Sequence, residues 1–273
     1  MSVDPETPSG GSSAAGVGQR LEIVAVPGIP EVRPGDDLVE QILAALEGAR
    51  LELRDHDIVV VAQKIVSKAE QRVVDLASVR PGRMAREWAE RHGKDARQVQ
   101  VVLDESVRIV RMDRGVMICE TRHGFICANA GVDASNAPPG CVLLLPSDPD
   151  ASARQLRVGL QGATGARIGV IVTDTWGRPW RLGITNVAIG ASGVPVLRDH
   201  RGEQDPAGRP IRVTVVAVAD ELAAAAELVM GKVSRIPAVI IRGLESGRLD
   251  EGPNASGCGA GSLVRPTEDD LFR

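Results

Sequence analysis

Apolar residues occur along this chain in two patterns: short continuous runs, and segments in which they recur with the period of a helix. Apolar runs bounded by turn residues predict strands. The stretch 58–74 contains two such runs, separated by the polar residues Gln63, Lys64, Ser67 and Lys68. The other predicted strands lie at residues 21–26, 98–103, 116–121, 125–130, 141–145, 168–175, 211–219 and 237–243.

Four segments show the helical period instead. Asp37 is placed to cap the first of them, in which apolar residues return on one face until Gly48. The predicted helices lie at residues 38–48, 84–93, 148–160 and 220–230. Strands outnumber helices and several follow one another directly. The pattern therefore predicts an α+β fold, with mixed or antiparallel sheets and packed helices.

The two ends of the chain differ in composition from its middle. Residues 1–19 are rich in Pro, Gly and Ser and contain no apolar block, which predicts a disordered tail and not a signal peptide. The stretch 246–273 is polar with several glycines, and is predicted to be a C-terminal tail. Residues 20–245 are left to form the folded domain, with room for two subdomains.

Composition narrows the classes of partner. Lys and Arg total 32 and Asp and Glu total 36, so the net charge is −4 without a basic run, which argues against nucleic acid. No apolar run is long enough to span a membrane. The chain has three Trp, two Phe and no Tyr, so we expect an aliphatic core and a ligand held by charge, backbone groups and metal.

The four cysteines show no metal-binding or redox spacing. Cys119, Cys127, Cys141 and Cys258 include no C-x-x-C pair, and no histidine follows them at zinc-finger spacing. Three lie in apolar stretches, where reduced cysteine packs as a small hydrophobic residue. We interpret them as structural thiols of a cytoplasmic protein.

Familiar catalytic and nucleotide motifs are absent. The sequence has no P-loop, no G-x-S-x-G and no H-E-x-x-H, and the spaced glycines of GLQGATGARIG follow a helical pattern rather than a strand. The chemistry must therefore come from other segments.

Two segments combine carboxylates with other oxygen donors. CANAGVDASN places Asp133 and Asn136 after a predicted strand, as a site for a hard cation and phosphate or as a self-satisfied Asx-turn. VTDTWGRPWR places Asp174 and Thr175 at the end of a buried strand, where they suit Mg²⁺ or Mn²⁺; the alternative is a plain strand-end turn. Its tryptophans are the only plausible ring-stacking residues.

Three weaker candidates remain. Lys68 in AQKIVSKAEQR would contact a phosphate as a point charge, although a solvated strand face explains the pattern as well. Lys232 in MGKVSRIP would do the same, although a helix end at Gly231 is also sufficient. His123, in the RHG turn, is a lone candidate whose role the sequence leaves open.

Taken together, these segments resemble the coenzyme F420-0:L-glutamate ligase family. The matching stretches are PGIPEVRPGDDL, QKIVSKAEQRVV, RHGFICANAGVDASN, VTDTWGRPWR, IPAVIIRG and LVRPTEDDLFR. They extend from about residue 21 to the end, and the chain resembles the stand-alone members without a fused flavin-type C-terminal domain. The resemblance implies a fold of two intertwined subdomains, and a homodimer with the site near the subunit contact.

The resemblance also implies a reaction. The family joins L-glutamate to the carboxylate of F420-0 at the expense of GTP, through an acyl phosphate, and further γ-linked glutamates can follow. Mg²⁺ or Mn²⁺, at two sites, assist the reaction, and K⁺ is associated with the family. Two alternatives stay open, namely a ligase of the same fold acting on another carboxylate and a non-catalytic nucleotide-binding module.

Family positions transfer to this chain residue by residue. Asp133, Asp174 and Thr175 match metal ligands of the family. Lys232 stands where the family tends to offer an oxygen donor, and a protonated lysine cannot ligate a cation. The implied GTP contacts are Ile29, Pro30, Glu31, Val32, Gln63, Lys68, Asn136, Gly231 and Lys232.

Overall fold

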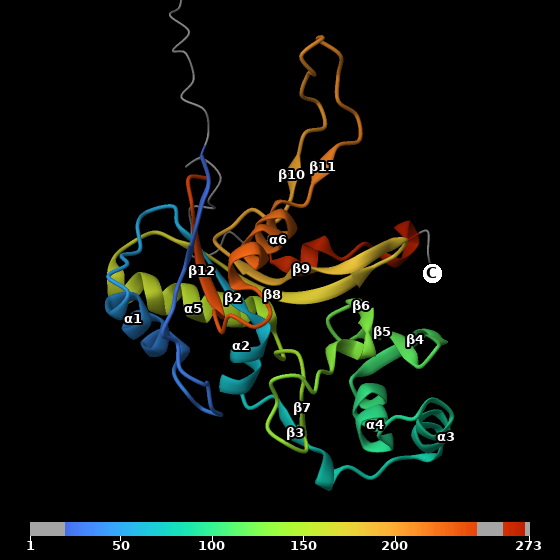
Figure 1. The fold of residues 1–273 in the computed structure, drawn as a ribbon. Coiled ribbons are helices and arrows are strands. Elements are labelled where there is room, and N and C mark those ends of the chain that lie inside the picture. The colour runs from blue at the N-terminus through green and yellow to red at the C-terminus, as the bar shows by residue number, and fades with distance from the viewer. Residues whose placement is uncertain (1–19, 245–258, 271–273) are drawn as a thin grey trace, which may run out of the picture.

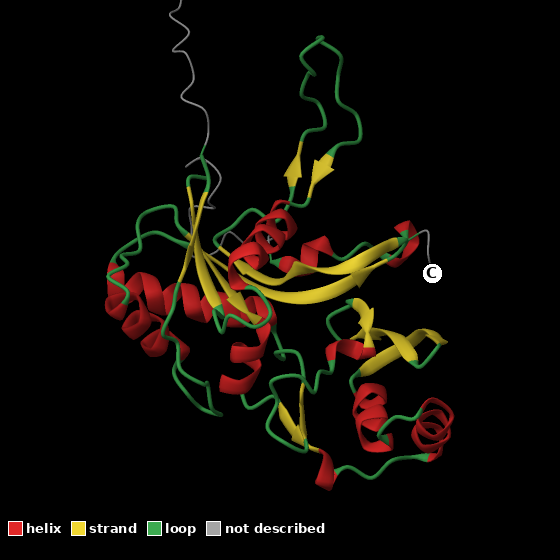
Figure 2. Ribbon diagram, viewed as in Figure 1, coloured by secondary structure: helices red, strands yellow, loops and turns green. Residues whose placement is uncertain are grey.

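A five-stranded mixed sheet forms the larger part of the protein, for which a computed structural model describes residues 20–244 and 259–270 (Figures 1 and 2). The strand order is β1-β12-β2-β8-β9; β2 and β8 run parallel, and the other neighbours are antiparallel. The strands are β1 (Glu22–Ala25), β2 (Ile58–Ala62), β8 (Gly169–Arg178), β9 (Arg181–Ser192) and β12 (Ala238–Arg242).

Helices cover both faces of this sheet, as Figure 1 shows. Helices α1 (Leu38–Gly48) and α5 (Pro149–Thr164) bury their apolar sides against one face, which presents Val59 and Val170. Helix α6 (Val218–Met230) covers the other face. Because both faces are buried, the central strands are continuous runs of Val and Ile, and the core is almost wholly aliphatic.

A smaller region has its own apolar core. Strands β4, β5 and β6 form an antiparallel sheet against two short helices, and β3 pairs with β7 at the junction with the larger region. The elements are β3 (Val73–Asp75), α3 (Arg83–His92), α4 (Ala96–Asp104), β4 (Ser106–Asp113), β5 (Val116–Thr121), β6 (Ile126–Ala128) and β7 (Cys141–Leu143).

Two further segments complete the described chain. A ribbon of β10 (Arg198–Asp199) and β11 (Val215–Val216) projects away from the sheet (Figure 1). The short 3₁₀ turns η4 (Ala260–Leu263) and η5 (Thr267–Asp269) form the C-terminal segment. Asp150 anchors it, since its carboxylate accepts hydrogen bonds from the backbone N–H of Ala191 and Ala260, both at 2.8 Å.

One glycine sets the distance between α5 and β9. A Cβ atom at Gly190 would lie 2.1 Å from the carbonyl oxygen of Pro149, the first residue of α5. No side chain fits at that separation, so the helix reaches the sheet only because position 190 is glycine.

The α+β prediction is confirmed, three local predictions are wrong, and two strands were not predicted. Residues 63–69 form helix α2 (Gln63–Ala69), and 98–103 belong to α4, because Asp95 caps a helix there and Val99 and Val102 face the small core. Of the predicted strand 211–219 only β11 forms, and α6 begins at Val218. Strands β4 and β9 were not anticipated, because their half-polar sequences lack the continuous apolar signal.

The predicted N-terminal tail, residues 1–19, lies outside the described residues, and so does Cys258. Of the predicted C-terminal tail, only residues 259–270 are described. Cys119, Cys127 and Cys141 are free thiols, and burial, with smaller effects from Asp174 and Cys119, raises the pKa of Cys127 to about 12. In the described part of the chain, no helix is both long and apolar enough to cross a membrane.

Candidate active site

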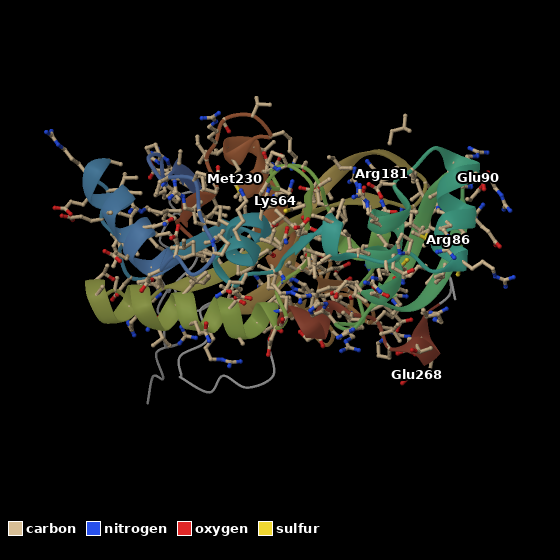
Figure 3. All side chains as sticks on the ribbon, turned by 90° about the horizontal axis from the view of Figure 1, so that it is seen from below. Lys64, Arg86, Glu90, Arg181, Met230 and Glu268 are labelled. Carbon is tan, nitrogen blue, oxygen red and sulfur yellow. The ribbon has the colours of Figure 1, made fainter. Side chains whose placement is uncertain are left out.

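A cavity of about 520 Å³ opens where β2 ends at Ala62, opposite Thr173 of β8. The two strands run parallel up to this point and β8 continues to Arg178, so the cavity lies beyond the carboxyl end of β2, the usual place for a ligand in such sheets. The 29–32 turn, α2, and the loop after α6 complete the wall. In Figure 3 Lys64 and Met230, which both line the cavity, lie beside each other, while Arg86 and Glu90 of α3 lie at the far end of the molecule.

The structure gathers almost the whole predicted set around this cavity. Asp133 is the one predicted site residue that does not line it, although Lys64, which does, is in contact with Asp133. The predicted residues that line the cavity are Ile29, Pro30, Glu31, Val32, Gln63, Lys68, Asn136, Asp174, Thr175, Gly231 and Lys232.

Helix α2 fixes one wall by burying its polar side chains. Gln63 Nε2 donates to Ser67 Oγ at 2.6 Å and to the carbonyl oxygen of Leu144 at 3.1 Å. Lys68 is buried and forms an ion pair with the exposed Glu31 of the 29–32 turn. The solvated strand face considered for this stretch is therefore wrong, and a buried ammonium faces the cavity.

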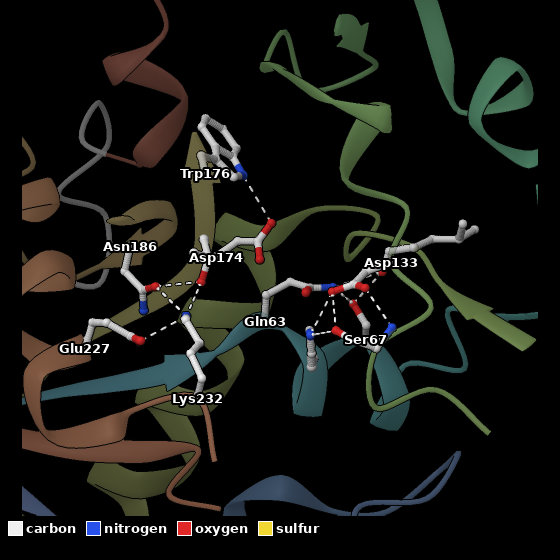
Figure 4. A network of polar contacts seen from close by, with 12 residues as sticks. Gln63, Ser67, Asp133, Asp174, Trp176, Asn186, Glu227 and Lys232 are labelled. Carbon is white, nitrogen blue, oxygen red and sulfur yellow. Dashed lines mark hydrogen bonds and ion pairs between the residues drawn. The ribbon is translucent and has the colours of Figure 1, made fainter. Parts of the chain in front are cut away.

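Asp133 is held by a lysine and by its own turn (Figure 4). Its Oδ2 lies 2.7 Å from Lys64 Nζ, and its Oδ1 accepts from the backbone N–H of Ser135 at 2.7 Å, which is the Asx-turn considered above. Burial acts to raise the pKa of Asp133, but the hydrogen bonds from Lys64 and Ser135 outweigh it, so the pKa is lowered.

Asp174 has a different environment. Its Oδ2 accepts a hydrogen bond from the indole N–H of Trp176 at 3.1 Å. Desolvation raises the pKa of Asp174 despite this bond and the backbone N–H of Thr175. The Trp176 ring is in turn held by an edge contact with Phe125, at 5.3 Å between ring centroids. A carboxylate with a raised pKa that faces a cavity is poised to gain a cation.

The loop after α6 closes the opposite wall. Gly231 ends α6 with a positive φ of 59°, as one interpretation of MGKVSRIP expected. It also lines the cavity together with Lys232, as the other interpretation requires. Lys232 Nζ donates to Thr175 Oγ1 at 2.6 Å and pairs with Glu227 Oε1 at 2.9 Å. Thr175 donates its own hydroxyl hydrogen to Asn186 Oδ1 at 2.7 Å (Figure 4).

Among the charged and amide side chains that line the cavity, four were given no role from the sequence: Lys64, Asn186, Glu227 and Arg235. Lys64 lies in the polar interruption of the stretch 58–74, so the sequence locates it but does not show that it lines the cavity. Asn186 reaches the site because it is opposite Thr175 in the β8–β9 register, a pairing between distant positions that no local motif reveals. Glu227 lies on an otherwise ordinary helix.

Two residues with open roles lie elsewhere. His123 stacks on Phe125, and its Nε2 lies 2.9 Å from the carbonyl oxygen of Pro146, so its imidazole fixes the turn rather than lining the cavity. Trp180 lies in the β8–β9 hairpin turn with 82% of its surface exposed. Only Trp176 of the two tryptophans in this segment contacts the site.

The donor set suits a hard cation that takes part of its coordination from a ligand. Among the described residues, no group of three or more His, Cys, Asp or Glu side chains could hold a metal ion. Asp174 nevertheless offers a desolvated carboxylate at the cavity wall, and hard cations prefer oxygen. The residues therefore fit a divalent ion whose remaining ligands are phosphate oxygens and water.

The chain belongs to a family of ligases. The family model described as "F420-0:Gamma-glutamyl ligase" matches residues 28–243, which include every cavity-lining segment, and the chain belongs to this family.

Similar proteins agree over nearly the full chain. A coenzyme F420:L-glutamate ligase of Methanopyrus kandleri is 50% identical over 256 residues, 93% of this chain and 98% of the relative. Its counterpart from Methanothermobacter thermautotrophicus is 46% identical over 254 residues, 93% and 99% of the two chains. The counterpart from Archaeoglobus fulgidus is 42% identical over 256 residues, 93% and 97% of the two chains. The resemblance noted from the sequence is confirmed.

Proposed function

We propose that this protein joins L-glutamate to the carboxylate of F420-0 at the expense of GTP, and that further γ-linked glutamates can follow. The observation that carries the proposal is the cavity at the carboxyl end of β2, in which three lysines and a desolvated carboxylate surround space for a phosphorylated ligand. The names of the similar proteins supply the two substrates.

The proposed reaction has two steps. An oxygen of the acceptor carboxylate attacks the γ-phosphorus of GTP. The bond between this phosphorus and the bridging oxygen of the β-phosphate breaks, and GDP leaves with its electron pair. The amine of glutamate then attacks the acyl carbon, phosphate leaves, and the nitrogen loses a proton. Both steps depend on positioning and on neutralising phosphate charge, which Lys64 and Lys68 of α2 and Lys232 of the loop after α6 supply from two walls of the cavity.

A divalent ion, Mg²⁺ or Mn²⁺, would be held by Asp174. Thr175 is the next residue on β8, and Asp133 contacts the cavity through its ion pair with Lys64. When bound, such an ion neutralises charge that develops on transferring phosphate oxygens. Trp176 orients the Asp174 carboxylate through its indole N–H. A role for K⁺ belongs to the same proposal, without assigned ligands.

We also propose a cytoplasmic homodimer. Free thiols at the opposed positions Cys119 and Cys127 of β5 and β6 suit a reducing compartment. The β8–β9 hairpin exposes 99% of Leu182 and 61% of Ile184 beside Trp180, an apolar tip that a second subunit would cover. Light scattering of the purified protein measures this directly, and a monomer mass would contradict it.

The function is tested by the mass of the product. Incubation with GTP, Mn²⁺, glutamate and F420-0 is expected to yield F420-0 heavier by one or more glutamyl residues, with release of GDP. Absence of any added glutamate, with the acceptor recovered unchanged, would contradict the assignment.

The same assay separates the two alternatives. A panel of other carboxylate acceptors, followed by GDP release, identifies a ligase with a different acceptor. GTP binding without GDP release on any acceptor would identify a nucleotide-binding module.

A further inference from the structure

The ammonium group of Lys232 lies in a cluster of oxygen atoms at the cavity wall (Figure 4). Its Nζ is 2.6 Å from Thr175 Oγ1, 2.9 Å from Glu227 Oε1 and 3.4 Å from Asn186 Oδ1. Thr175 donates its hydrogen to Asn186, so a lone pair of its oxygen is left for the ammonium. The three oxygens come from β8, α6 and β9, and Lys232 joins them from the loop after α6.

This cluster has the chemistry of a cation site. Carboxylate, hydroxyl and amide oxygens are the ligands that hard divalent ions take in proteins. A protonated lysine has only donors, so it cannot serve as a fourth ligand beside these oxygens. The Lys232 ammonium and a divalent ion therefore compete for the same three side chains. The ammonium has the advantage because it is covalently attached to the chain.

Asp174, the residue before Thr175, is not occupied in this way. The hydrogen bonds to its side chain come from the indole of Trp176 and the backbone N–H of Thr175. Among residues 20–244 and 259–270, no lysine or arginine forms an ion pair with it. Two adjacent positions on β8 therefore differ, since Asp174 is open to a metal ion and the oxygens next to it are held by lysine.

We propose that Lys232 replaces a divalent cation at the oxygens of Thr175, Asn186 and Glu227. These side chains then bind no metal ion in this protein, and the divalent ion is held at Asp174 alone. The positive charge beside the phosphates is present at any metal concentration. The role in phosphoryl transfer rests on the proposed function, whereas the number of bound ions does not.

The test counts Mn²⁺ bound to the full chain, by calorimetry and by the loss of the free-ion EPR signal, in a titration with MnCl₂ and without nucleotide. Lys232→Gln removes the charge and adds an oxygen donor, and is expected to bind one more Mn²⁺ per chain than the unmodified protein. Lys232→Arg keeps the charge and is expected to bind the same number as the unmodified protein. Thermal unfolding of each variant verifies that it is folded.

A second pair of variants locates the additional ion. Glu227→Gln combined with Lys232→Gln is expected to lose it, because its only carboxylate ligand is gone. An unchanged Mn²⁺ count in Lys232→Gln would overturn the proposal, and so would an ion in the unmodified protein that Glu227→Gln alone removes. Asp174→Asn tests the other ion: if it leaves the count of the unmodified protein unchanged, the metal assignment in the proposed function fails while the lysine comparison still stands.

Discussion

Asp174 lines the cavity, Asp133 contacts it through Lys64, and the two carboxylates are held in opposite ways. Asp133 belongs to a loop after the small sheet and is neutralised by Lys64 and the Ser135 backbone. Asp174 belongs to a buried strand, where desolvation outweighs its two N–H partners. The charge of Asp133 is neutralised without any ligand, whereas the charge of Asp174 destabilises the fold until a cation binds.

This difference has opposite consequences for stability. The pKa of Asp133 is lowered, so its charge stabilises the fold at neutral pH, and that contribution disappears as the pH falls through the lowered value. The pKa of Asp174 is raised, so its charge destabilises the fold at neutral pH, and that cost disappears at low pH. Asp174 is therefore the residue that a bound cation would relieve.

The largest expected effect is that of Asp174→Asn. Turnover falls roughly 10³-fold, because the stabilisation that a held cation provides amounts to several kcal/mol. The melting temperature of the ligand-free protein rises at pH 7 by about 2 °C, because a desolvated charge is removed. Steady-state kinetics and calorimetry measure the two quantities. Normal turnover would refute the role of Asp174, and a lower melting temperature would refute the account of its burial.

Asp133→Asn is expected to act more weakly and with the opposite sign on stability. Turnover falls about tenfold, because Lys64 loses its charged partner but keeps a hydrogen-bond acceptor. The melting temperature falls by about 1 °C at pH 7, a small change because the pair is partly exposed to solvent. Ser135→Ala is the matched control, since it preserves the carboxylate. Equal losses in the two aspartate variants would remove the distinction between them.

The smallest effect is expected for Trp176→Phe, which retains a ring against Phe125 and removes the indole N–H. Losing one typical hydrogen bond costs about 1 kcal/mol, so kcat and Mn²⁺ affinity each fall by about fivefold. Trp180→Phe, in the exposed hairpin turn, serves as the control and leaves both unchanged. A loss of melting temperature without a change in Mn²⁺ affinity would show that Trp176 only packs.

The sequence predicts the parts of this site that local motifs carry. Asp174 and Thr175 are found because they follow an unmistakable apolar run, although β8 continues past them to Arg178, and Gln63 and Lys68 are found because they interrupt such a run. The helix over 63–69 escapes prediction because seven residues give too few turns for a period to be read. Asn186 and Glu227 escape because strand register and the return of α6 bring them to the cavity, and both depend on contacts between distant positions.

Gly190 limits which substitutions the fold accepts, although it carries no reactive group. Asn186 lies four residues before it on β9, and the contact between Gly190 and Pro149 holds that strand against α5. A lineage can exchange one oxygen donor in the cavity for another, but it can add no atom at position 190 without moving the helix.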